Sequence, residues 1–286
     1  MRWKSVSWIC SLMAFFAVAL FVGVLGEAAR AATIFSEGFG GATADSNITT
    51  GNTTFTAISG TGTNATLFAL TDTGSVFANA NQYLQYNDAS TSLSPAAVAS
   101  WSALSNSVFA LSFDFFDVDD PTGTTAAPRL ILSNGSSATS TNQLVNLSFV
   151  NGALDATIDG AASTTVPLTG GYTMNAPHHI DIYGNMSASG VTYGLSSESL
   201  GAGKFDVWFD GAKVANMDDL GFRFSQTSLT ELGIRVTSNG GSRVTRLNFD
   251  NFSVTDALPS VPEPSSMFLV CCGVLGVSLF RRCRSI

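Results

Sequence analysis

The amino-acid sequence predicts an all-β domain folded as a two-sheet sandwich, because three features of its central part agree. Phe and Thr are abundant there, Lys and Glu are scarce, and Gly, Ser and Asn interrupt the apolar runs. Several runs alternate apolar and polar residues. Asn-Gly and Asp-Gly pairs separate some of these runs, as in β-hairpins.

The composition limits the possible classes of protein. Hydrophobic residues make up 45% of the 286 residues and charged residues 12%, which excludes a disordered chain. The central part is acidic, which disfavours nucleic acid and anionic lipid as its partners. The four cysteines lie in the two terminal segments, so the central domain has no disulfide and no thiol nucleophile: Cys10, Cys271, Cys272 and Cys283.

The first 31 residues have the parts of a secretory signal peptide. Arg2 and Lys4 provide the charged start, Ile9–Leu25 is the apolar run, and the small residues Ala29 and Ala31 follow it. We predict cleavage by signal peptidase after Ala31. The alternative is an uncleaved membrane anchor, which would export the chain as well.

Residues 32–256 are predicted to form the sandwich. The run Val108–Phe116 alternates, so that Leu111, Phe113 and Phe115 share one face of a strand. No repeat of fixed period is present, which disfavours a solenoid or a propeller.

Local sequence also predicts the interruptions of the strands. Within Leu247–Val254 the apolar alternation shifts by one residue at Asp250-Asn251, which is the pattern of a β-bulge. Residues Pro95–Leu104 are rich in Ala and predict a short crossover helix. Three pairs predict tight hairpin turns, because both central residues of such turns need positive φ: Asn151-Gly152, Asp159-Gly160 and Asp210-Gly211.

The C-terminal segment combines a linker, an apolar run and a basic end. Residues 257–266 form a Pro-rich linker, residues 267–280 are predicted to be a transmembrane helix, and residues 281–286 are its basic cytoplasmic end. The positive-inside rule places three arginines in the cytoplasm and therefore the domain outside, in agreement with the signal peptide: Arg281, Arg282 and Arg284.

Two stretches of the domain resemble the concanavalin A-like (laminin G-like) family. They are Phe205-Asp-Val-Trp-Phe-Asp-Gly, similar to a late hairpin of that family, and the closing strand Phe249-Asp-Asn-Phe-Ser-Val. The resemblance implies a jelly-roll sandwich.

The tail resembles the PEP-CTERM sorting signal, which is also known as an ice-binding-protein C-terminal domain. Val261-Pro262-Glu263-Pro264 matches the motif of that signal, residues 267–280 its apolar span, and Arg281, Arg282 and Arg284 its basic end. The resemblance implies processing by an exosortase-type enzyme and delivery to the cell surface or the extracellular matrix. The alternative is a C-terminal anchor that is never cut.

The densest acidic cluster is a candidate calcium site. A strand end runs into a Pro-Gly loop that could gather carboxylates, although Pro121 breaks the spacing of an EF-type loop. A solvated loop is the alternative interpretation of these residues: Asp114, Asp117, Asp119 and Asp120.

His178 and His179 are the only histidines, and they begin a predicted strand at Ile180-Asp181-Ile182. Neighbouring strand residues point to opposite faces, so the two imidazoles cannot both bind one metal ion from a regular strand. Nothing in the local sequence indicates that either histidine is a catalytic base. We expect an ordinary, partly exposed pair.

Aromatic residues make polysaccharide binding the leading hypothesis for a ligand. Sugars stack on exposed rings, and seven residues of the domain could provide such rings: Tyr83, Tyr86, Trp101, Tyr172, Tyr183, Tyr193 and Trp208.

A glycan hydrolase and a purely structural surface protein are the alternatives to a binding module. Hydrolysis needs two carboxylates that flank the sugar bond, and jelly-roll glucanases resemble one another in a Glu-x-Asp-x-x-Glu strand. That strand is missing, because the domain's only glutamates are Glu37, Glu198 and Glu231. Ice binding is disfavoured as well, since the Thr-x-Thr pairs have no constant period. We therefore expect an exported, non-catalytic protein without a cofactor.

Overall fold

Two antiparallel β-sheets pack face to face, so the predicted all-β sandwich is confirmed. The computed structural model describes residues 32–62, 65–78, 81–88, 90, 95–104, 106–118, 127–160, 162–194, 197–236 and 245–260. They lie in one compact unit, Ala32–Pro259, apart from Ser260. Within these ranges the only helical elements are two 3-10 turns, Ser140–Asn142 and Ala215–Met217.

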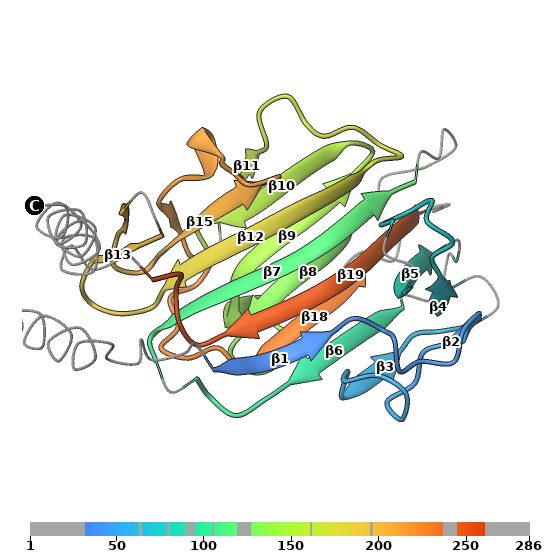
Figure 1. The fold of residues 1–286 in the computed structure, drawn as a ribbon. Helices are drawn as coiled ribbons and strands as arrows, with labels where there is room; N and C mark the ends of the chain where they lie inside the picture. The colour runs from blue at the N-terminus through green and yellow to red at the C-terminus, as the bar shows by residue number, and fades with distance from the viewer. Residues whose placement is uncertain are drawn as a thin grey trace, which may run out of the picture. The chain divides into compact units, whose positions relative to one another are not determined.

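Strands from both ends of the domain meet in the larger sheet. Figure 1 shows β1, β19, β7, β12 and β15 side by side at the front of the domain. In spatial order the main path is β16 (Ala212–Lys213), β15 (Lys204–Phe209), β12 (Pro177–Asn185), β7 (Val108–Asp117), β19 (Thr245–Thr255), β5 (Gln82–Asp88), β4 (Ala65–Thr71) and β2 (Ser46–Asn47). Beside this path β1 (Thr33–Glu37) pairs with β19, and β17 (Leu220–Gly221) pairs with β15.

The smaller sheet lies behind the larger one in Figure 1. In spatial order its strands are β11 (Thr164–Pro167), β10 (Ala153–Ile158), β9 (Gln143–Val150), β8 (Pro128–Ser133), β18 (Glu231–Val236), β6 (Ala96–Ser100) and β3 (Ala57–Ser59). A separate hairpin consists of β13 (Val191–Tyr193) and β14 (Glu198–Leu200).

Phenylalanine rings fill the space between the two sheets. Phe113 of β7 lies 5.5 Å from Phe252 of β19 and 6.5 Å from Phe149 of β9 between ring centroids. Phe115 lies 5.0 Å from Phe149. All four rings are at most 2% exposed. Because apolar burial is the main driving force of folding, this layer holds the sheets together.

The predicted bulge in β19 is confirmed. Asp250 pairs with Asp114 of β7, but the next paired residue, Ser253, faces Ser112, so β19 contains one extra residue. Asn251 absorbs the extra length with φ of 53°, a left-handed conformation that Asn tolerates better than most residues.

All three predicted turn pairs have positive φ at both residues. Asn151 and Gly152 join β9 to β10 with φ of 45° and 79°, and Asp210 and Gly211 join β15 to β16 with φ of 48° and 77°. The third pair, with φ of 60° and 48°, begins a longer connection to β11: Asp159 and Gly160.

The predicted helix over Pro95–Leu104 is wrong. This segment contains β6, which pairs with β18 on one side and with β3 on the other. A helix of this length has little stability of its own, whereas two flanking strands satisfy the backbone of a strand on both sides. Alanines also suit this position, because their small side chains lie buried against the core.

We predict that Gly184→Ala destabilises the domain by about 1–3 kcal/mol, because it overpacks the core. A Cβ at this position in β12 would lie 2.1 Å from Cζ of Phe109, which is fully buried. Urea unfolding of the two proteins measures the difference.

The matched control is Gly221→Ala. A Cβ at Gly221 meets nothing within 4 Å. Its free energy of unfolding should change by less than about 0.5 kcal/mol. Equal effects of the two substitutions would contradict the close packing of Phe109 on Gly184.

Candidate functional site

The outward face of the larger sheet carries the candidate site. In β12, Ile180 and Ile182 are fully buried in the core, so His179, Asp181 and Tyr183 point to the opposite face. The neighbouring strands β7 and β15 place further polar and aromatic residues beside them. We call the following set the outer-face cluster: Ser112, Asp114, His179, Asp181, Tyr183 and Trp208.

His179 lies between two carboxylates of the cluster. Its Nδ1 is 2.5 Å from Oδ1 of Asp114, and its Nε2 is 3.2 Å from Oδ1 of Asp181. These hydrogen bonds, first from Asp114 and then from Asp181, raise the pKa of His179 to about 10, while partial burial opposes them. His179 is therefore an imidazolium at neutral pH.

The charge on His179 decides what the neighbouring serine can do. Ser112 Oγ is 3.1 Å from Nε2 of His179, which resembles the contact between a nucleophile and its base. An imidazolium donates both ring protons and cannot accept one from a serine. The Asp-His-Ser arrangement therefore does not activate Ser112 at neutral pH.

His178 points to the other face, as the strand geometry predicts. Its ring centroid lies 4.9 Å from that of Phe209 and 5.4 Å from that of Phe115, and Nδ1 lies 2.9 Å from Oδ2 of Asp210. The two histidines cannot bind one metal ion. In the part of the chain that the structure describes, no group of three or more His, Cys, Asp or Glu residues is arranged to hold a metal ion.

Tyr183 and Trp208 form the aromatic part of the cluster, and both are half-buried. Their ring centroids lie 6.2 Å apart at an interplanar angle of 73°. Tyr193 of the β13–β14 hairpin packs 4.8 Å from Tyr183, and its hydroxyl accepts a hydrogen bond from Nε1 of Trp208 at 2.9 Å. The β13–β14 hairpin therefore packs against part of both rings and holds them in place, and each ring stays partly exposed.

The hydroxyl group of Tyr183 stays protonated at physiological pH. Burial and, secondly, the charge of Asp181 raise the pKa of Tyr183 to about 12. Tyr183 therefore offers a neutral hydroxyl as well as a ring face.

The other five aromatic candidates support the fold. The hydroxyl of Tyr86 donates to the carbonyl of Pro95 at 3.0 Å inside the core, and Nε1 of Trp101 donates to the carbonyl of Leu229 at 3.1 Å. The remaining three pack within the protein: Tyr83 against Phe77, Tyr172 against Phe115, and Tyr193 against Tyr183 and Trp208 of the outer-face cluster.

Of the candidate calcium residues, the two that the structure describes point to opposite faces of β7. Asp114 points outward to His179, whereas Asp117 is buried and accepts a hydrogen bond from the hydroxyl of Tyr172 at 2.6 Å. Asp119 and Asp120 lie outside the described residues.

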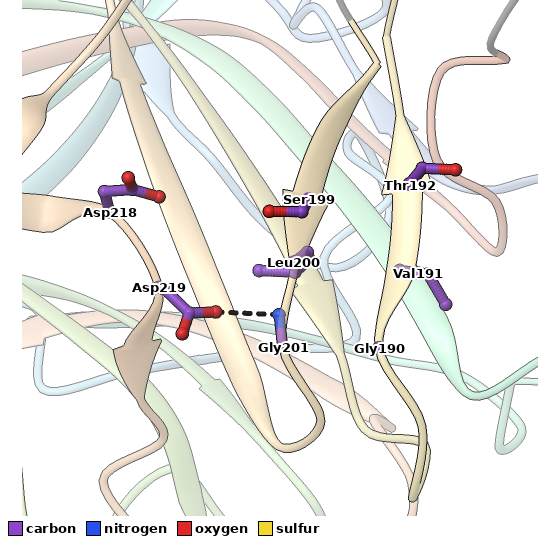
Figure 2. Close-up of a pocket in the computed structure, with 8 residues that line it drawn as sticks. All are labelled: Gly190, Val191, Thr192, Ser199, Leu200, Gly201, Asp218 and Asp219. Carbon is purple, nitrogen blue, oxygen red and sulfur yellow. Dashed lines mark hydrogen bonds between the residues drawn. The ribbon is translucent and has the colours of Figure 1, made fainter.

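An open depression lies beside the β13–β14 hairpin. Figure 2 shows Asp219 at its edge, where a carboxylate oxygen accepts a hydrogen bond from the backbone N–H of Gly201 at 2.7 Å. The other lining residues include no aromatic ring and no cation: Gly190, Val191, Thr192, Ser199, Leu200 and Asp218. The outer-face cluster is chemically better suited to bind a ligand than this depression.

Four members of the outer-face cluster are candidates from the sequence, whereas Ser112 and Asp181 are not: Asp114, His179, Tyr183 and Trp208. The signal was present, because Ser112 and Asp114 alternate with the apolar residues of β7 and must therefore share the outward face. What the sequence lacks is the strand order that brings this face of β7 beside β12.

The predicted terminal sites lie outside the described residues. They are the cleavage residues Ala29 and Ala31, the apolar segment 267–280, and the sorting residues Pro262, Glu263, Pro264, Arg281, Arg282 and Arg284. Within the described ranges, no helix is long and apolar enough to cross a membrane.

Comparison with solved structures finds proteins of similar fold. It is similar to an endo-β-1,4-glucuronan lyase from the fungus Trichoderma reesei, with a TM-score of 0.53 and 12% identity over 79% of this chain and 96% of that one. It is also similar to a carbohydrate esterase from the Shiga toxin-encoding bacteriophage phi24B, with a TM-score of 0.52 and 11% identity over 80% and 100% of the two chains. At such low identity the similarity establishes the jelly-roll fold alone.

The sequence comparison identifies the tail. Residues 260–284 match the PEP-CTERM protein-sorting motif, which indicates sorting to the cell envelope or surface. The comparison with curated proteins finds no match to this chain.

We predict that His179 stays protonated well above neutral pH. Its pKa of about 10 exceeds the ordinary value of 6.5 for an unfolded chain, so its contacts stabilise the fold fully below pH 6.5. That contribution is lost as the pH rises through 10. NMR titration of the imidazole protons measures the pKa directly.

Thermal unfolding of His179→Gln provides the second measurement. The wild-type protein should lose stability between pH 6.5 and 10, in part because His179 loses its proton. The variant should lack this part of the decline. A His179 that titrates near 6.5 in the folded protein would contradict the described contacts.

Proposed function

We propose that this protein is an exported surface protein that binds extracellular polysaccharide through the outer-face cluster and catalyses no reaction. The observation that carries the proposal is the pair of half-buried rings, Tyr183 and Trp208, held beside the polar groups of Asp181 and His179. Rings supply stacking surfaces for sugar faces, and carboxylates accept hydrogen bonds from hydroxyl groups.

Small side chains beside the cluster leave room for a polymer. Ala110 lies opposite Tyr183 on β7, and Thr255 of β19 lies opposite Ala110. In the next row Ser253 of β19 lies opposite Ser112. The rows of β7 and β19 next to Tyr183 therefore carry only small side chains at these positions.

The charge of the site favours a neutral or amine-bearing polysaccharide. Between Ala32 and Ser260 there are 19 Asp and Glu and 7 Lys and Arg residues, a formal net charge of −12. Asp114 and Asp181 are each partly exposed, with side-chain exposures of 24% and 22%, and one imidazolium lies between them. A polyuronate would meet net repulsion at this face.

The chemistry of the cluster supports a non-catalytic role. The imidazolium ring lies between the carboxylates of Asp114 and Asp181 and occupies the space that a glycosidic bond would need. Ser112 lacks a base, because His179 carries a proton on each nitrogen. An enzyme acting on glycans remains the alternative, since proteins of similar fold are named as a lyase and an esterase.

The two terminal segments supply the proposed route to the polysaccharide. Signal peptidase would cleave after Ala31 during export. An exosortase-type enzyme would then process the tail at Pro262-Glu263-Pro264 and release the domain from its membrane anchor. This processing rests on the sorting motif matched at residues 260–284.

We predict that Tyr183→Ala weakens polysaccharide binding about 5- to 20-fold, equivalent to about 1–2 kcal/mol, because the stacking ring is lost. Affinity electrophoresis of the full chain in mild detergent measures this, in gels that contain the polysaccharide of the producing cells or a neutral glucan. Tyr183→Phe keeps the ring and should retain most of the affinity.

The matched control is Phe68→Ala. Phe68 is a half-buried ring on the outward face of β4 in the same sheet, four strands from β12. Its removal should leave binding unchanged. Unchanged binding by a folded Tyr183→Ala variant would contradict the proposed site, and shortening of the polymer by the wild-type protein would contradict the non-catalytic role.

A further inference from the structure

Two arginines lie side by side on the outward face of the smaller sheet. Arg129 of β8 and Arg235 of β18 are direct cross-strand partners. Their neighbours Leu130 and Ile234 are buried in the core, so both arginines point away from it. Like charges directly opposite each other destabilise a sheet. This pair is therefore unexpected unless another interaction offsets the repulsion.

A third arginine approaches the same face from a loop. The backbone N–H of Arg223 donates to the carbonyl of Leu144 at 2.8 Å, which places its segment along the start of β9. Its Nη1 donates to Oε1 of Gln143, which also accepts a hydrogen bond from Nδ2 of Asn146 at 2.9 Å. Partial burial and, secondly, the charge of Arg223 lower the pKa of Arg129, in agreement with their proximity.

Among the residues that the structure describes, the three arginines have no counter-charge. They are three of the seven cations between Ala32 and Ser260, and none of them forms an ion pair with any residue that the structure describes. The Nε atom of each is buried without a hydrogen-bond partner, and so is Oδ1 of the nearby Asn146. A guanidinium that loses water without gaining a partner costs stability.

Neutral polar groups also lie beside the three arginines. Ser148 of β9 is the cross-strand partner of Arg129, and Ser163 Oγ lies 3.4 Å from Nη2 of Arg223. Along the same row of paired residues, the closest acidic residue is Asp155 of β10, which pairs with Ser148. In its described part, this face therefore combines three cations with neutral hydroxyl and amide groups, which is the composition of an anion site.

We propose that Arg129, Arg223 and Arg235 form a binding site for an oxyanion, a carboxylate or a sulfate group, on the outward face of the smaller sheet. The planar fork of each guanidinium matches the two oxygens of such a group, and an anion would satisfy the buried donors. The site lies on the opposite side of the sandwich from the outer-face cluster and does not depend on the proposed function.

The test uses the full chain in mild detergent and compares sodium sulfate with sodium chloride at equal ionic strength. Sulfate should raise the Tm of the wild-type protein more than chloride does, because a ligand of the native state stabilises it. In the double variant Arg129→Gln/Arg235→Gln, the sulfate affinity measured by isothermal titration should be at least about tenfold weaker. In chloride the same variant should be at least as stable as the wild-type protein, since no described ion pair is lost and the repulsion between the two arginines is removed.

A second arm distinguishes a free anion from one carried by a polymer. An oligosaccharide of glucuronate should bind the wild-type protein more tightly than inorganic sulfate if a polysaccharide is the natural ligand, and equally or more weakly if a small anion is. Arg129→Lys/Arg235→Lys keeps both charges without the forks and should show intermediate affinity.

Two control variants separate this site from other effects. Arg246→Gln removes an exposed arginine of β19 and should keep the sulfate response, and Tyr183→Ala should keep it as well. The proposal would be overturned by equal effects of sulfate and chloride on the wild-type protein, or by loss of the response in Arg246→Gln. A double variant that is less stable than the wild-type protein in chloride would assign the arginines a structural role and overturn it too.

Discussion

One extra residue in β19 connects the core of this domain to its candidate site. The bulge at Asp250 and Asn251 lets Phe249 before it and Phe252 after it both point into the core, where a regular strand would turn one of them outward. It also brings Nδ2 of Asn251 to 2.7 Å from Oδ2 of Asp114, the carboxylate that binds His179. Packing between the sheets and the charge arrangement on the outward face therefore depend on the same local geometry.

The parts of the fold that were predictable from the sequence are those set by local backbone chemistry. Asn151-Gly152 and Asp210-Gly211 adopt positive φ at both positions, as hairpins of this kind require. The bulge was visible as a shift in the apolar pattern. The helix predicted for Pro95–Leu104 is wrong because alanine favours a helix only locally. In the fold, β6 lies between two strands that supply partners for its backbone hydrogen bonds.

The candidate site was predictable as single residues but not as a group. His179 and Asp114 are 65 positions apart, and only the pairing of β12 with β7 makes them neighbours. The same pairing turns an unremarkable histidine into an imidazolium, which removes Ser112 as a nucleophile. Of the seven aromatic candidates, Tyr183 and Trp208 differ from the others in that they are partly exposed on the outward face of the larger sheet beside His179 and Asp181. Alternation with Ile182 and with Val207 predicts the outward face for Tyr183 and Trp208, but the sequence does not show that the β13–β14 hairpin packs against them.

The two outward faces of the domain differ in charge, with carboxylates and aromatic rings on the larger sheet and arginines on the smaller one. We propose that polysaccharide binds to the larger sheet. Hydrogen–deuterium exchange of the full chain, with and without the polysaccharide of the producing cells, tests this binding most directly. We expect slower exchange in β12, in the adjacent strands β7 and β15, and in the β13–β14 hairpin, with the polymer recovered intact. Slower exchange confined to the smaller sheet, or recovery of shortened polymer, would contradict the proposal.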